Sequence, residues 1–120
     1  MIDDKTVAYA AAVHPCFEDL KQAAAQLAGL LVLNSKDPLL RRSAEEACQR
    51  AMDGLSKANV SASARLYHEH LLNAAARIKE AQRTSGDPLP LLKSADTHLR
   101  AAARALPGFQ MVSFERACCA

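Results

Sequence analysis

Residues 64–81, with the sequence ARLYHEHLLNAAARIKEA, contain the pattern that decides the fold. Apolar side chains recur there in steps of three and four residues, at Ala64, Tyr67, Leu71, Ala74, Ile78 and Ala81. Such steps place the side chains on one face of an α-helix, which has 3.6 residues per turn. Most of the remaining positions are polar or charged. The stretch therefore predicts an amphipathic helix with one buried face.

The same spacing occurs in three other segments. The apolar positions are Phe17, Leu20, Ala24, Leu27 and Leu31; then Leu40, Ala44, Ala47, Ala51 and Leu55; and finally Leu92, Ala95, Leu99, Ala102 and Leu106. We predict helices over residues 14–34, 38–57, 61–84 and 88–106. Outside the C-terminal tail, no window alternates with the period of two that is typical of a strand. The predicted fold class is therefore all-α.

Two short segments separate the predicted helices, Asn34-Ser35-Lys36-Asp37-Pro38 and Ser85-Gly86-Asp87-Pro88. Each ends in Asp-Pro, and Asp at an N-cap followed by Pro in the first turn is a strong helix start. Short connections make neighbouring helices antiparallel. We predict an up-down-up-down four-helix bundle made of two αα-hairpins. The two Asp-Pro segments also suggest an internal duplication, although chance similarity is an equal explanation in an alanine-rich chain.

Both ends of the chain depart from the helical pattern. Pro15 predicts the start of the first long helix, with a separate short helix at about residues 3–13. The alternative is one continuous, kinked helix. Leu106-Pro107-Gly108 ends the fourth helix, which divides the chain into a bundle domain of residues 1–106 and a tail of residues 107–120. Interaction residues are predicted in the tail at Phe109, Met111, Val112 and Phe114, covered either by the bundle itself or by a partner.

Composition limits the classes of function. Half of the 120 residues are apolar, which suits one globular domain, but there is no Trp and aromatics make up only 4%. Alanine favours helices yet buries little apolar area, so burial of the core contributes less stability per residue than it would in a leucine-rich core. The net charge of +2 does not indicate a nucleic-acid-binding protein. No membrane-spanning or signal segment is expected, and a cytoplasmic location is the default.

Histidines are the first candidates for metal binding. His68 and His70 lie two residues apart on one predicted helix, so they point in different directions and cannot share an ion. His98 on the facing helix could join either of them, and Cys48 would complete a ligand set suited to a transition metal. The alternative is that each histidine simply bonds a neighbour. No cofactor is expected, with a transition metal as the alternative.

The cysteines show no metal-binding or redox spacing. Cys16 follows the predicted helix start at Pro15, where a helix N-terminus would lower the pKa of the thiol and make it reactive. The alternative is a small packing residue. Cys118 and Cys119 are vicinal thiols that could bind a soft metal or form intermolecular disulfides, or have no role.

One charged feature stands out. Lys93, Arg100 and Arg104 form a basic face on the fourth helix, which could meet an acidic partner but also resembles an ordinary solvated face.

No glycine-rich phosphate loop or nucleophile–base motif indicates catalysis. We therefore expect a non-enzymatic protein–protein interaction module, either a homodimer or a subunit of a larger assembly. One alternative is a thiol- or metal-responsive sensor. The other is a small-ligand-binding bundle with a cavity lined by Tyr67, His98 and Met52.

Overall fold

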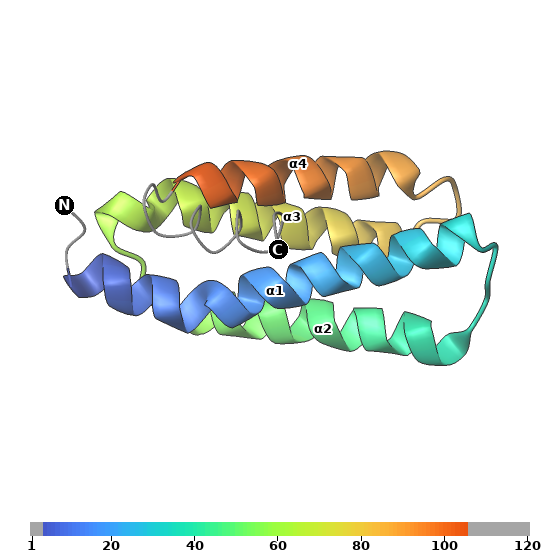
Figure 1. Ribbon diagram of the computed structural model, residues 1–120, viewed down its shortest axis with the longest axis horizontal. Coiled ribbons are helices and arrows are strands. Elements are labelled where there is room, and N and C mark those ends of the chain that lie inside the picture. Colours follow the sequence, from blue (N-terminus) through green and yellow to red (C-terminus); the bar gives the residue numbers. More distant parts are fainter. Residues whose placement is uncertain (1–3, 106–120) are drawn as a thin grey trace, which may run out of the picture.

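The computed structural model describes residues 4–105, and within them it is all-helical with no strand. The elements are α1 (Asp4–Val32), α2 (Pro38–Lys57), the short 3-10 helix η1 (Ala62–Ala64), α3 (Arg65–Arg83) and α4 (Leu89–Ala105). Figure 1 shows that successive long helices run in opposite directions. The predicted fold class is confirmed. The predicted tail of residues 107–120 lies outside the described residues.

The four helices are arranged as two hairpins. α1 packs along α2, and α3 packs along α4, more extensively than either hairpin contacts the other. The hairpins meet mainly through α2 with α3 and α1 with α4 (Figure 1). The two Asp-Pro connections lie at the same end of the bundle, because each joins an ascending helix to a descending one.

Both Asp-Pro segments start helices in the way the sequence predicts. The Leu39 amide donates to Oδ1 of Asp37 at 2.9 Å, and the Leu89 amide donates to Oδ1 of Asp87 at 3.0 Å. At the end of α1, Asn34 has a φ of 49°, and the Ser35 amide donates to the Leu30 carbonyl at 2.9 Å. This left-handed residue reverses the chain and satisfies a carbonyl at the helix end.

The predicted helix break at Pro15 is wrong. α1 continues from Asp4 to Val32 through this proline, which is the continuous alternative. Proline has no N–H and cannot bond the carbonyl four residues earlier, a loss that costs about 3 kcal/mol inside a helix. Burial on both sides offsets this cost, because Tyr9 and Val13 before the proline, as well as Phe17 after it, are all buried. The N-terminal extension is therefore part of the first bundle helix.

The core follows the predicted apolar faces with a few differences. Leu31 and Leu40 are each 38% exposed, and Ala24 is only half-buried while its neighbour Ala23 is fully buried. Alanine supplies nearly half of the buried apolar residues. Small side chains let helices approach closely, and at Gly54 a Cβ atom would lie only 2.5 Å from Sγ of Cys16. The α1–α2 contact therefore depends on the absence of a side chain at this position.

Candidate functional site

One end of the bundle exposes large apolar side chains. The apolar end, as we call it, consists of Leu31, Val32, Leu33, Leu39, Leu40 and Leu89. Val32 is 84% exposed, and Leu33 and Leu39 are each 73% exposed. The end of α1, the start of α2 and the start of α4 all lie at this end of the bundle (Figure 1). Exposed apolar side chains gathered at one place favour contact with another protein.

A polar link joins the two hairpins beside the apolar end. Arg41, in the first turn of α2, donates from Nη2 to the Gln82 carbonyl at 2.7 Å and lies 3.6 Å from Glu45. Gln82 is in the last turn of α3, whose partial negative charge attracts a guanidinium. A hollow of about 370 Å³ adjoins this link and includes Leu27 and Leu30 in its lining. The charge at the start of α2 thus links the two hairpins at the surface of the bundle.

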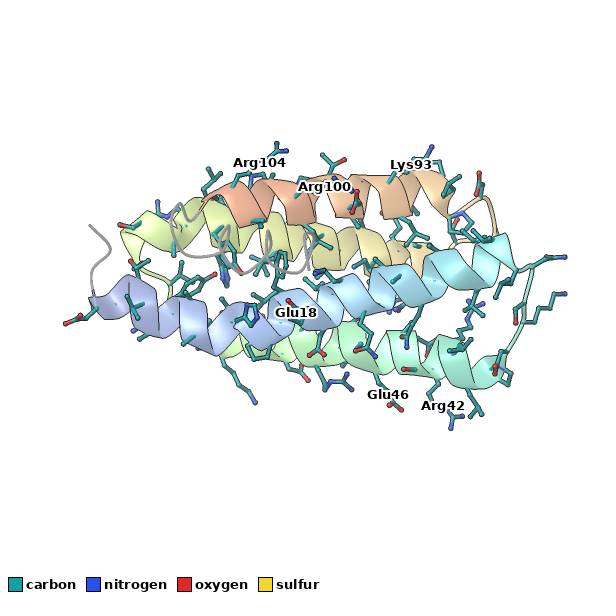
Figure 2. All side chains as sticks on the ribbon, viewed as in Figure 1. Glu18, Arg42, Glu46, Lys93, Arg100 and Arg104 are labelled. Atoms are coloured by element: carbon teal, nitrogen blue, oxygen red, sulfur yellow. The ribbon has the colours of Figure 1, made fainter. Side chains whose placement is uncertain are left out.

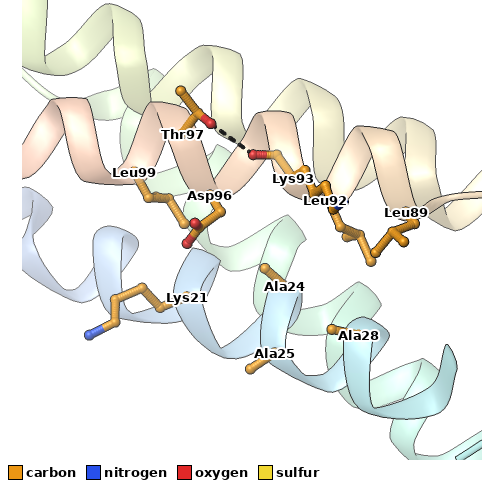
Figure 3. A pocket seen from close by; sticks show the side chains of 10 residues that line it. All are labelled: Lys21, Ala24, Ala25, Ala28, Leu89, Leu92, Lys93, Asp96, Thr97 and Leu99. Atoms are coloured by element: carbon orange, nitrogen blue, oxygen red, sulfur yellow. Dashed lines mark hydrogen bonds between the residues drawn. The ribbon is translucent and has the colours of Figure 1, made fainter. Parts of the chain in front are cut away.

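A groove of about 660 Å³ runs between α1 and α4. Figure 3 shows small side chains of α1 facing leucines of α4 across it, with charged side chains beside them. The lining includes Ala24, Ala25 and Ala28 on α1 and Leu92 and Leu99 on α4. The alanines leave this space because they are too short to reach the facing helix.

The residues predicted around a small-ligand cavity lie away from the two hollows described above. Tyr67 is fully buried, and its ring packs edge-on against Tyr9 with centroids 5.9 Å apart. Neither Tyr67, His98 nor Met52 lines the α1–α4 groove or the hollow beside Arg41. Within the described residues, no partner is placed for the buried Tyr67 hydroxyl. This part of the interior is packed around aromatic rings.

The histidines are distributed over two separate contacts. The Tyr9 hydroxyl lies 2.8 Å from Nδ1 of His68, which joins α1 to α3. Nδ1 of His70 lies 3.1 Å from Nδ1 of His98, which joins α3 to α4. Burial lowers the pKa of both His68 and His98, and for His98 the neighbouring His70 and Arg77 charges act in the same direction.

The predicted metal ligands, His98 with either His68 or His70 and with Cys48, come together only in part. Cys48 is buried, and its thiol lies 3.8 Å from the Ala75 carbonyl, which it faces instead of a histidine. Only His70 and His98 of the predicted set come together. From Asp4 to Ala105, no group of three or more His, Cys, Asp or Glu side chains is placed to hold a metal ion. The sequence predicts which helix carries each of these residues, but it does not predict how each helix is rotated about its own axis.

Cys16 does not occupy a helix start. It lies within α1, is only 5% exposed, and is a free thiol packed beside Gly54. Burial raises the pKa of the Cys16 thiol, and the nearby Asp19 carboxylate adds to this effect. The premise of a reactive thiol was a helix that begins at Pro15, and that premise is wrong. The other two candidate thiols, Cys118 and Cys119, lie outside the described residues.

The predicted basic face is exposed along α4. Lys93, Arg100 and Arg104 lie on this helix (Figure 2), and Nε of Arg100 pairs with the Asp96 carboxylate at 2.8 Å. An exposed pair of this kind contributes little to stability. The predicted interaction residues Phe109, Met111, Val112 and Phe114 fall outside the part of the chain that the structure describes.

Comparisons with known proteins add no assignment. No helix among residues 4–105 is both long enough and apolar enough to cross a membrane. No protein-family model, curated protein or solved structure matches this chain.

Proposed function

We propose that this chain is a non-enzymatic protein–protein interaction module that associates with a second copy of itself through the apolar end. The observation that carries the proposal is the exposure of Val32, Leu33 and Leu39 at one end of the bundle. Leucine and valine are usually buried, and a group of them on a surface is typical of an interface.

The charges around the apolar end favour a second copy as the partner. Lys36 and Asp37 lie in one connection, and Asp87 lies in the other. In a twofold interface each residue meets the symmetry-related surface, so a rim that contains both signs is self-complementary. The net charge of +2 produces only weak repulsion between copies.

The expected association is reversible. Fully burying one exposed Leu or Val side chain stabilises a complex by roughly 1.5–3 kcal/mol. Val32 is 84% exposed and Leu33 and Leu39 are each 73% exposed, so burying what remains open of these three side chains on both copies would contribute roughly 7–14 kcal/mol. The association cost is about 4–15 kcal/mol. A micromolar dissociation constant needs a net gain of about 8 kcal/mol. Only the favourable end of these ranges reaches that value, so we expect weak, reversible dimerisation with a dissociation constant of roughly micromolar or above.

The test is the molecular mass over a range of concentrations. Sedimentation velocity is expected to show a shift from one to two copies between roughly 1 and 300 µM, a span that covers micromolar affinities. The double substitution Leu33→Ser and Leu39→Ser should remove the shift. Leu66→Ser with Leu72→Ser is the matched control, since these leucines are exposed on α3 outside the apolar end.

Two results would contradict the proposal. The first is a single-chain mass at every concentration. The second is an equal loss of association in the control variant, which would place the interface elsewhere. A parallel deletion of residues 107–120 tests whether the predicted tail residues contribute to the same interface.

We also propose a cytoplasmic location for the protein. Its support is that Cys16 and Cys48 are both free thiols, as is usual in a reducing compartment. Fractionation of the native cells, with the protein detected by antibody, tests this location.

A further inference from the structure

We propose that His70 and His98 form a two-histidine site for a divalent transition-metal ion of the zinc class, between α3 and α4. The two Nδ1 atoms are 3.1 Å apart, the ring centroids are 5.4 Å apart, and the ring planes are inclined by 40°. The site is separate from the apolar end, and its existence does not depend on the proposed self-association.

The spacing of the two nitrogens suits a shared ion. Zinc binds imidazole nitrogen at about 2.0–2.1 Å in tetrahedral geometry, so two such ligands are about 3.3 Å apart. The observed separation of 3.1 Å differs from this value by only a few tenths of an ångström. Turning each ring until its lone pair points roughly 40° away from the line between the two nitrogens would aim both lone pairs at one ion, with little change in the distance between the nitrogens.

The proton arrangement is compatible with metal binding. Without metal, one Nδ1–H donates to the other Nδ1, so one ring carries its proton on the nitrogen that faces its partner. Metal binding requires a lone pair on both Nδ1 atoms. The donor ring therefore moves its proton to Nε2 through solvent, and both imidazoles remain neutral. Neither ring has to gain or lose a net proton.

The backbone holds the pair in place. His70 precedes the buried Leu71, and His98 precedes the buried Leu99, so each histidine is next to a residue that fixes the rotation of its helix. α3 and α4 also pack along their whole hairpin. Rigid elements position ligands more accurately than loops do. Both rings are half-buried, which leaves one side open to an ion from solvent.

The surroundings set the expected strength of binding. Within residues 4–105 no third His, Cys, Asp or Glu joins the pair, so water would fill the remaining positions of the ion. The Arg77 charge, which acts on His98, opposes a cation there, although Nη1 of Arg77 also pairs with Glu80 at 3.2 Å. Two ligands and a nearby positive charge predict micromolar rather than nanomolar affinity.

The experiment is calorimetric titration of ZnCl₂ into the full chain carrying Cys118→Ser and Cys119→Ser, which removes the vicinal thiols. One Zn²⁺ per chain is expected. His70→Gln and His98→Gln should each weaken binding at least tenfold. His14→Gln is the matched control, because His14 faces Glu18 on α1 at 3.7 Å, and it should leave the affinity unchanged. Arg77→Gln should tighten binding several-fold.

A second measurement needs no substitution of the ligands. Long-range ¹H–¹⁵N spectra of the imidazoles should show that Zn²⁺ shifts Nδ1 of His70 and His98, while the His14 and His68 signals stay in place. The proposal is overturned by equal zinc affinity in His98→Gln and its parent, by shifts confined to other histidines, or by the absence of any bound zinc at millimolar concentration.

Discussion

The contact between Gly54 and Cys16 allows a direct test of how closely α1 and α2 approach. Alanine is favoured over glycine inside a helix by about 1 kcal/mol, so local propensity alone predicts that Gly54→Ala stabilises the protein. The added Cβ would lie 2.5 Å from Sγ of Cys16, which is buried and has little room to move. Overpacking of this kind costs typically about 1–3 kcal/mol. We therefore expect Gly54→Ala to lower the free energy of unfolding by about 1 kcal/mol.

The chain offers a matched control and a rescue. Nothing lies within 4 Å of a Cβ built on Gly29, which lies inside α1 as Gly54 lies inside α2, so Gly29→Ala should stabilise by about 0.5–1 kcal/mol. In a Cys16→Ala background the obstructing sulfur is absent, and Gly54→Ala should become stabilising by a similar amount. The difference between the two backgrounds is the coupling energy of the pair, which we expect to be about 1–3 kcal/mol.

Urea unfolding followed by far-UV circular dichroism measures all five proteins, namely the parent, the three single variants and the double variant. The slope of the transition should stay constant, since the surface exposed on unfolding hardly changes. If Gly54→Ala stabilises as much as Gly29→Ala does, whatever residue is at position 16, the close approach of the two helices is refuted.

Four further predictions concern individual elements. Pro15→Ala should stabilise by about 1–3 kcal/mol in urea unfolding, because it restores a helical hydrogen bond within α1; a neutral or destabilising result would favour a helix that begins at this proline. Asp37→Ala and Asp87→Ala should each cost about 1 kcal/mol by the same assay, since each removes the side chain that accepts from the first helical turn. Tyr67→Phe should be neutral or stabilising by up to about 1 kcal/mol, because it removes a buried hydroxyl with no partner among residues 4–105. A decrease of more than about 1 kcal/mol in the free energy of unfolding would reveal a hydrogen bond of this hydroxyl. The pKa of His68 is lowered in the folded state, so the folded protein binds fewer protons than the unfolded chain. The free energy of unfolding should therefore fall as the pH drops below about 6.5. His68→Gln should weaken this pH dependence in urea midpoints measured from about pH 7.5 to about pH 5.

The helices themselves could be read from the sequence because their causes are local. The three- and four-residue spacing of Tyr67, Leu71 and Ile78 reflects the geometry of a single helix, and all three are fully buried. The Asp37 and Asp87 caps bond amides two residues away, so their effect does not depend on the rest of the fold. α2 accordingly occupies the predicted residues 38–57.

Residues distant in the sequence decided the remaining features. The continuity of α1 through Pro15 depends on burial against other helices, which outweighs a local rule about proline. The pairing of His70 with His98 depends on how two helices are rotated about their axes, and a helical period alone does not set that angle. The exposure of Leu31 and Leu40 is likewise a matter of tertiary position, because both keep the helical spacing yet lie at the end of the bundle and stay partly open to solvent.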